Sequence, residues 1–354
     1  MSTAIFPPPH AESLLLVTGG TGLVGSHVVE RACSAGWNVR ALVRPNSDLS
    51  FLQTLPVECV EGSLNDPASL IPLSRGVTHC IHCAAKVGDW GSVSEYRKTN
   101  VDGLRHLLEA LSDAGTLQQF VHLSSLGVYP ATDHYGTDES APVNREGIDG
   151  YTVSKVEAEE LVQHHVRDRS LPVVILRPGW IYGPRDRTVL PRLLRNLELG
   201  KVVYLGSGRQ LLNQIYVGNL VDAIFLALAR PDLRGRIYNL TDGHLVSRIE
   251  FMETICNLAG LNPPRGHIPL SVARLIAGLM EGTYRLLGRQ QGPILSQARV
   301  KFLGLHLDYS IDRAQYELHY TPRVGFKEGM RTTMDWIINQ KCERECCCKP
   351  EVTG

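Results

Sequence analysis

From residue 14 onward, the chain alternates short apolar runs with helical patterns, and this alternation constrains its fold more than any other feature. Three of the runs are SLLLVTGG (13–20), WNVRALVR (37–44) and LPVVILRPG (171–179), and helical patterns such as VDGLRHLLEALSDAG (101–115) lie between such runs. Strands that alternate with helices of this length predict βαβ units and a parallel sheet covered on both faces. The predicted fold class is therefore α/β, a doubly wound Rossmann sheet.

The alternation weakens after about residue 184, which predicts more than one region. We expect a flexible N-terminus over 1–13, a dinucleotide-binding domain over 14–184, a smaller and mostly helical substrate-binding region over 185–340, and a cysteine-rich tail over 341–354. Part of the substrate-binding region, about 210–242, is expected to return to the first domain.

One helical pattern of the substrate-binding region, within 269–288, carries an apolar face. Its members are Val272, Leu275, Ile276, Leu279, Met280 and Tyr284. This spacing fits a helix packed on the core, or else an apolar lid over a hydrophobic substrate.

Composition and charge exclude several partners. Lys plus Arg and Asp plus Glu both number 36, so no overall field favours nucleic acid. The N-terminus lacks a signal-peptide pattern, which predicts a cytoplasmic protein, and no run is apolar enough to span a bilayer. Peripheral contact with a membrane and a homodimer both stay open.

Cys80 and Cys83 form a C-x-x-C, but alternation along a strand points them to opposite faces, so no metal site is predicted.

The loop TGGTGLVG follows the first apolar run and opens a helix. Glycines in this context permit a tight turn and a close backbone approach, and a helix N-terminus favours a pyrophosphate. We expect a dinucleotide on the following loop residues: Gly19, Thr21, Gly22, Leu23, Val24 and Gly25.

The residues at the end of the second predicted strand indicate whether the ribose of the cofactor carries a 2′-phosphate. An NAD site usually has an acidic residue there, whereas this chain has Val43 followed by Arg44. A guanidinium suits the 2′-phosphate of NADP, so NADP(H) is favoured over NAD(H). Arg44 is alternatively an ordinary solvated residue at a strand end.

In GYTVSK (150–155), Tyr151 and Lys155 stand four residues apart, so they share one face of a helix. Such a pair is either an ordinary surface contact or a phenol held beside a cation. A tyrosine of ordinary pKa, about 10, is a poor base near neutrality. An ammonium one turn away, together with the positive ring of an oxidised cofactor, is expected to favour the phenolate.

Four motifs, TGGTGLVG, HLSS (122–125), YTVSK and RPGWIYGPRD (177–186), resemble those of the extended short-chain dehydrogenases/reductases, within the NAD-dependent epimerase/dehydratase superfamily. The chain is further similar to the 3β-hydroxysteroid dehydrogenase branch. AAKVGDWGSVSEYRKTNVDG (84–103) resembles the 2-alkyl-3-oxoalkanoate reductases, and other stretches resemble the sterol-4α-carboxylate 3-dehydrogenases.

The resemblance implies a catalytic trio of Tyr151 as acid/base, Lys155 as its partner and Ser125 as the residue that fixes the substrate oxygen. It also implies that Asn100 helps to fix the helix in which it lies. The positions that it places beside the cofactor are Ser63, Ala84, Ala85, Asn100, Tyr151, Lys155, Pro178 and Gly179. Ser63 departs from the family, which often has an acid there to contact adenine.

The expected activity is an NADP(H)-dependent interconversion of a ketone and a secondary alcohol on a bulky hydrophobic substrate, either a 2-alkyl-3-keto acid or a 3-hydroxy or 3-keto sterol-like ring. Two alternatives stay open. One is a nucleotide-sugar epimerase or dehydratase with tightly bound NAD, and the other is a non-catalytic NADP(H)-sensing protein.

Overall fold

The fold is centred on a seven-stranded parallel sheet, seen here in a computed structural model that describes residue 10, residues 12–289 and residues 291–347. The strand order is β12-β7-β5-β4-β1-β2-β3, and every pair of neighbours is parallel. The strands are β1 (Leu14–Thr18), β2 (Asn38–Val43), β3 (Val57–Glu61), β4 (His79–His82), β5 (Gln119–Leu123), β7 (Val173–Pro178) and β12 (Ile237–Leu240). The predicted doubly wound fold is confirmed.

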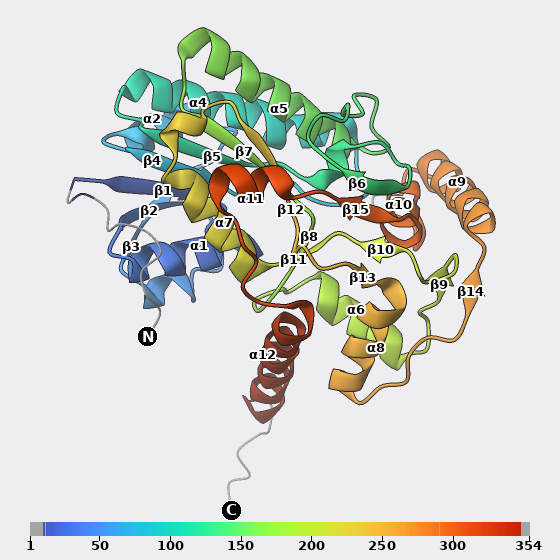
Figure 1. Ribbon diagram of the computed structural model, residues 1–354. Coiled ribbons are helices and arrows are strands. Elements are labelled where there is room, and N and C mark those ends of the chain that lie inside the picture. Colours follow the sequence, from blue (N-terminus) through green and yellow to red (C-terminus); the bar gives the residue numbers. More distant parts are fainter. Residues whose placement is uncertain (1–9, 11, 290, 348–354) are drawn as a thin grey trace, which may run out of the picture.

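Helices cover both faces of the sheet (Figure 1). One face packs on α1 (Leu23–Ser34), α7 (Val217–Leu228) and α11 (Asp312–Leu318). The other face packs on α2 (Pro67–Ser74), α4 (Gly103–Ala114) and α5 (Gly150–Arg169). Because helices bury both faces of the sheet, its strands are continuous apolar runs in the sequence.

Helix α4 shows how the sequence sets these elements. Leu104, Leu107, Leu108 and Leu111 recur at helical spacing and are all fully buried. The helix ends at Gly115, whose φ of 68° is a left-handed conformation that glycine adopts without a steric penalty.

The chain reverses direction across the sheet between β1 and β4. It passes from β1 outward to β2 and β3, and it then returns to form β4 on the other side of β1. In open parallel sheets, ligands bind outside the carboxyl ends of the strands at such a switch point. Gly19 follows β1 and Ala84 lies two residues after β4, so both lie at this edge.

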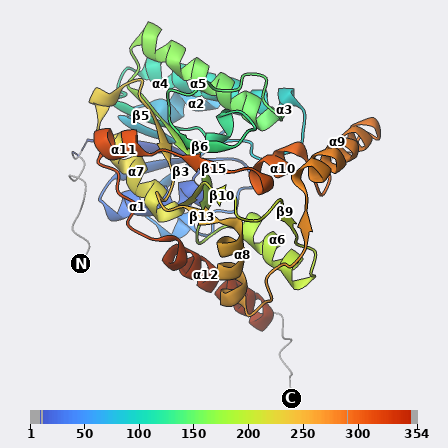
Figure 2. The ribbon, with the colours of Figure 1, turned by 45° about the vertical axis from the view of Figure 1, so that its right-hand side comes forward.

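A second cluster of helices packs beside the sheet (Figure 2). It joins α6 (Val189–Glu198), α8 (Arg248–Ala259) and α12 (Phe326–Cys347) around a shared apolar core. Among the described residues, four separate two-stranded sheets lie outside the seven-stranded sheet. They pair β8 (Trp180–Tyr182) with β11 (Gln214–Tyr216), β6 (His134–Thr137) with β15 (Leu307–Tyr309), β9 (Tyr204–Leu205) with β14 (His267–Ile268), and β10 (Leu211–Leu212) with β13 (Val246–Ser247).

The expected regions are placed as follows. Both α7 and β12 lie within the 210–242 stretch and belong to the sheet domain. The predicted N-terminus over 1–13 lies mostly outside the described residues, as do positions 348–354 of the cysteine-rich tail. The boundary at residue 184 stays a prediction.

The apolar face of helix α9 (Leu270–Leu286) is not packed on the core. Val272, Leu275, Ile276 and Leu279 are 44, 65, 37 and 64% exposed. The helix packs through small side chains, because Ala273 and Ala277 are its buried residues and they contact Val300 of α10 (Gln297–Gly304). The alternative of a core helix is therefore wrong for this face.

Candidate active site

The glycine loop lies against the end of β4. Gly19 has a φ of 72°, and a Cβ there would stand 2.8 Å from the backbone nitrogen of Ala84. A Cβ on Gly25 would stand 2.1 Å from the carbonyl oxygen of Gly19, so α1 approaches the turn only with glycine at that position. These two glycines therefore allow the turn to pack closely on the end of β4 and on α1.

The first turn of α1 suits an anion. Gly22 is the N-cap residue and provides no side-chain cap, and the first turn contains no acidic residue. Its backbone N–H groups and the positive end of the helix dipole point toward the crevice, as a pyrophosphate requires. The loop's Thr21, Leu23 and Val24 lie here as well.

Arg44 and Ser63 lie at neighbouring strand ends. Val43 of β2 is paired with Glu61 of β3, so the residues that follow them are close to one another. The side chain of Arg44 is exposed. The hydroxyl of Ser63 accepts a hydrogen bond from the backbone nitrogen of Asn65 at 3.2 Å. The structure thus brings both candidates to the cofactor edge of the sheet.

Tyr151, Lys155 and Ser125 converge at the carboxyl end of β5. Asp149 caps α5 by accepting a hydrogen bond from the backbone nitrogen of Thr152 at 2.8 Å, which fixes the start of the helix. Lys155 then lies one turn after Tyr151, with its Nζ 5.9 Å from the tyrosine ring centroid. Ser125, in the loop after β5, is close enough to Tyr151 to lower the pKa of its phenol.

Burial opposes the ionisation of Tyr151. Burial raises its pKa to about 12, although the hydrogen bond with Ser125 opposes this shift. The ammonium of Lys155 donates to the carbonyl oxygen of Leu123 at 2.7 Å. Burial also lowers the pKa of Lys155 to about 8, against the attraction of Glu159. In this state the phenol is protonated at neutral pH.

The two serines of HLSS have different partners, and this favours Ser125 as the one that faces the substrate. Ser124 is buried and its hydroxyl donates to Oε1 of Glu159 at 2.5 Å. Ser125 instead accepts a hydrogen bond from the backbone nitrogen of Gly127 at 3.0 Å and faces Tyr151.

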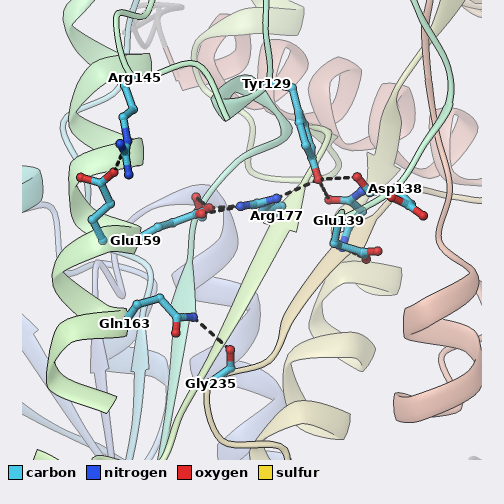
Figure 3. A network of polar contacts seen from close by, with 11 residues as sticks. Tyr129, Asp138, Glu139, Arg145, Glu159, Gln163, Arg177 and Gly235 are labelled. Carbon is cyan, nitrogen blue, oxygen red and sulfur yellow. Dashed lines mark hydrogen bonds and ion pairs between the residues drawn. The ribbon is translucent and has the colours of Figure 1, made fainter. Parts of the chain in front are cut away.

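Beneath the trio runs a buried polar network (Figure 3). Arg177 donates to both carboxylate oxygens of Glu159, at 2.9 and 2.6 Å, and to the hydroxyl of Tyr129 at 2.8 Å. The hydroxyl of Tyr129 donates in turn to Oδ1 of Asn239 at 2.9 Å. The network therefore connects α5, β7 and β12 behind the catalytic face.

Asn100 links the cofactor edge to α5. It lies in a π-helical turn, Lys98–Asp102, of the kind often found at functional sites. Its side chain accepts from the backbone nitrogen of Lys86 at 2.7 Å and donates to the Lys86 carbonyl oxygen at 3.0 Å. It also donates to the hydroxyl of Ser154 at 2.9 Å. Asn100 thus fixes the segment that follows Ala84 and Ala85 against the helix that bears Tyr151.

Pro178 and Gly179 close the site at the end of β7. The backbone nitrogen of Gly179 donates to the carbonyl oxygen of Leu240 at 2.9 Å, and a Cβ on Gly179 would lie 1.7 Å from the carbonyl oxygen of Asn213. Any other residue at this position would push the wall apart.

Two residues at this site were missed by sequence reasoning. Glu159 had a signal, because it continues the spacing of four set by Tyr151 and Lys155. Lys301 of α10 had none, since nothing in VKFLG distinguishes it. Its Nζ donates to the carbonyl oxygens of Gly127, at 2.9 Å, and Tyr129, at 2.7 Å, in the loop after Ser125.

No metal cluster and no membrane span are found among residues 10, 12–289 and 291–347. Within these ranges, no group of His, Cys, Asp and Glu side chains is arranged to hold a metal ion. No helix in the same ranges is long and apolar enough to cross a bilayer.

This combination of a Rossmann sheet, a glycine loop and a Ser–Tyr–Lys site is that of an extended short-chain dehydrogenase/reductase, an NAD(P)-dependent oxidoreductase acting on CH–OH groups. The model of the NAD dependent epimerase/dehydratase family matches residues 15–241, so the chain belongs to that family.

Several curated proteins are similar over most of their length. A 2-alkyl-3-oxoalkanoate reductase of Shewanella oneidensis is 29% identical over 89% of this chain and 84% of its own. A 4-hydroxy-2-methyl-3-oxo-4-farnesyl-3,4-dihydroquinoline-1-oxide ketoreductase of Stigmatella aurantiaca is 30% identical, covering 89 and 93%. The human sterol-4-alpha-carboxylate 3-dehydrogenase, decarboxylating, is 27% identical, covering 90 and 86%.

Solved structures share the fold. The crystal structure of gox2253 has a TM-score of 0.78 and 29% identity, covering 93% of this chain and 98% of its own. MoeE5 in complex with UDP-glucose and NAD has a TM-score of 0.73 and 26% identity, covering 92 and 99%. The expected resemblance to reductases and sterol dehydrogenases of this family is confirmed.

Proposed function

We propose that this protein is an NADP(H)-dependent reductase that converts a ketone on a bulky hydrophobic substrate to a secondary alcohol, with Ser125, Tyr151 and Lys155 as its catalytic residues. One observation carries the proposal: the phenol of Tyr151 lies near Ser125 and the buried ammonium of Lys155, at the carboxyl end of β5 in the parallel sheet.

Each residue of the trio has a role in proton transfer. Tyr151 donates its phenolic proton to the carbonyl oxygen as that oxygen gains charge, and Ser125 holds the same oxygen by a hydrogen bond. The raised pKa of Tyr151 suits this direction because the donor must be protonated when the reaction begins. Positioned acid catalysis of this kind is worth roughly 10² to 10⁴ in rate.

A bound nicotinamide would supply the hydride, and the residues present fit such a cofactor. The tight turn at Gly19 and Gly25 would present the N-terminus of α1 to the pyrophosphate, and Pro178 and Gly179 would form a wall beside the ring. Lys155 has three donors and would also reach the ribose hydroxyls. The absence of an acid after β2, with exposed Arg44 there instead, supports NADP(H) over NAD(H).

The substrate class rests on the relatives. Two of them are named as reductases of a 3-oxo compound, and the third as a sterol dehydrogenase. All of these names describe a carbonyl or hydroxyl group on a largely apolar molecule. A 2-alkyl-3-keto acid and a 3-keto sterol-like ring are therefore the proposed substrates. The predicted cytoplasmic location and homodimer stay predictions.

A nucleotide-sugar epimerase or dehydratase is the second candidate, because MoeE5 binds UDP-glucose and NAD and has the same fold. It would use the same tyrosine and lysine but would regenerate its cofactor in each turnover. A non-catalytic NADP(H) sensor is less favoured, because the chain retains both residues.

One experiment separates these candidates. Purified protein is incubated with NADPH or NADH and a panel of 2-alkyl-3-keto acids, 3-ketosteroids and UDP-sugars, while absorbance of the reduced nicotinamide is followed. The proposal predicts NADPH oxidation with a keto acid or ketosteroid. Interconversion of UDP-sugars without net change of cofactor would identify an epimerase instead, and binding of NADPH without turnover of any compound would favour the sensor.

A further inference from the structure

Helix α9 and the segment after it expose an unusual amount of apolar surface. Besides Leu275 and Leu279, exposed at 65 and 64%, Leu286 and Leu287 are 88 and 61% exposed and Ile294 is 81% exposed. Single exposed apolar residues are normal, but exposed apolar residues that recur along one side of a helix mark an interaction surface. We call this set the α9 face: Val272, Leu275, Ile276, Leu279, Leu286, Leu287 and Ile294.

The charges around the α9 face are mostly basic. Arg274, Arg285 and Arg289 are all exposed. The single acid between residues 270 and 289 is Glu281, which is only 14% exposed and accepts a hydrogen bond from the backbone nitrogen of Gln297 at 2.7 Å. Glu281 is also paired with Arg285 at 3.5 Å. The exposed charge on this segment is therefore positive and complements an anionic surface.

The position of α9 leaves this face open. The helix lies at the periphery of the molecule, away from the parallel sheet, in both views (Figures 1 and 2). It is attached through Ala273 and Ala277, whose short side chains leave the longer apolar ones pointing outward.

The same segment touches the loop that borders the active site. Trp90 donates from Nε1 to the carbonyl oxygen of Arg289 at 3.0 Å, and its ring lies 6.2 Å from that of Tyr284. The hydroxyl of Tyr96 donates to the carbonyl oxygen of Trp90 at 3.0 Å, and the ring of Tyr96 lies 6.4 Å from that of Tyr151. The α9 face is thus connected to the catalytic tyrosine through two aromatic residues.

We propose that the α9 face docks onto the surface of an anionic phospholipid membrane. Its leucines and isoleucines enter the boundary between headgroups and acyl chains, and Arg274 and Arg289 contact the phosphates. A helix with an apolar face and arginines beside it lies in the interface plane and does not span the bilayer. Docking there would bring the active-site loop to the bilayer, where hydrophobic substrates dissolve. This benefit rests on the proposed function, whereas the docking itself is independent of it.

Vesicle flotation tests this without reference to turnover. The full chain is mixed with vesicles of phosphatidylcholine alone, or of phosphatidylcholine with phosphatidylglycerol. Wild-type protein is expected to float with the mixed vesicles and much less with phosphatidylcholine alone. The double variant Leu275→Asn, Leu279→Asn should lose at least about tenfold in vesicle affinity, since each leucine loses its apolar burial. The double variant Arg274→Gln, Arg289→Gln should lose the preference for phosphatidylglycerol.

Controls keep the test decisive. Ile71→Asn alters an equally exposed apolar residue on α2 and should leave flotation unchanged. Circular dichroism verifies that each variant is folded. Failure of wild-type protein to bind either vesicle, or equal binding by the leucine variant, would overturn the proposal. A wild-type dimer that the leucine variant converts to monomer in light scattering would also overturn it, because a second copy would then be the partner of the α9 face.

Discussion

At the scale of single residues, the proposed preference for NADPH over NADH rests on Arg44. Arg44 directly follows Val43, which stands where an NAD site usually has a carboxylate, and a charge-assisted hydrogen bond to a phosphate is worth about 1.5–3 kcal/mol. We expect Arg44→Ala to weaken NADPH binding by about 10- to 100-fold and to leave NADH binding unchanged, as measured by fluorescence titration of the reduced nicotinamide.

Arg75→Ala provides the matched control, since Arg75 is also exposed but lies at the far end of α2 from the cofactor edge. Equal losses of affinity for NADPH and NADH in Arg44→Ala would mean that Arg44 does not bind the 2′-phosphate.

At the scale of elements, the Arg177–Glu159 pair holds α5 against β7. Both side chains are buried, at 4 and 6% exposure, and their contact is bidentate. Removing one partner leaves the other charge buried without compensation, which typically costs about 3–5 kcal/mol. Arg177→Met is therefore expected to lower the free energy of unfolding in urea by about that amount.

Arg145→Met serves as the control because Arg145 also contacts a glutamate, Glu160, at 2.6 Å, but both side chains are exposed. This variant is expected to lose less than about 1 kcal/mol of unfolding free energy. Similar losses in the two variants would show that the buried pair has no special part in holding the elements together.

The sequence predicted the elements better than their contacts. The central strands and α4 followed from apolar periodicity, and the cofactor loop followed from Gly19, Gly22 and Gly25. Periodicity alone did not reveal which side of α9 is buried, so a core helix and an apolar lid both stayed open for it. Lys301 was missed because its contacts, with Gly127 and Tyr129, are more than 170 positions away in sequence. The state of Tyr151 also depends on burial, which spacing cannot show.

At the scale of the whole molecule, buried and half-buried histidines make stability depend on pH. Burial lowers the pKa of His27 and of His79 to about 4 and that of His82 to about 3, from an ordinary value of 6.5. Between pH 6.5 and 4 the unfolded chain binds protons that the folded chain does not. As pH falls through that range, these histidines therefore lower the free energy of unfolding, each by at most about 1.4 kcal/mol per pH unit.

The contribution of one histidine can be isolated. His79→Phe removes a titrating group whose ring packs on the edge of Trp37, at 4.8 Å between centroids. Urea unfolding at a series of pH values should show a shallower loss of stability between pH 6.5 and 4 than in wild-type protein. His164→Phe, at an exposed position, should retain the wild-type slope. An unchanged slope in His79→Phe would contradict the assignment.

The central claim is that Tyr151 donates the proton in a reduction that uses NADPH. Steady-state turnover of the best keto substrate and NADPH affinity are measured on the same preparation of Tyr151→Phe, with the exposed Tyr316→Phe as control. The predicted result is a fall in turnover of at least about 10² with unchanged NADPH affinity in Tyr151→Phe, and wild-type behaviour in the control. Near wild-type turnover by folded Tyr151→Phe would contradict the claim.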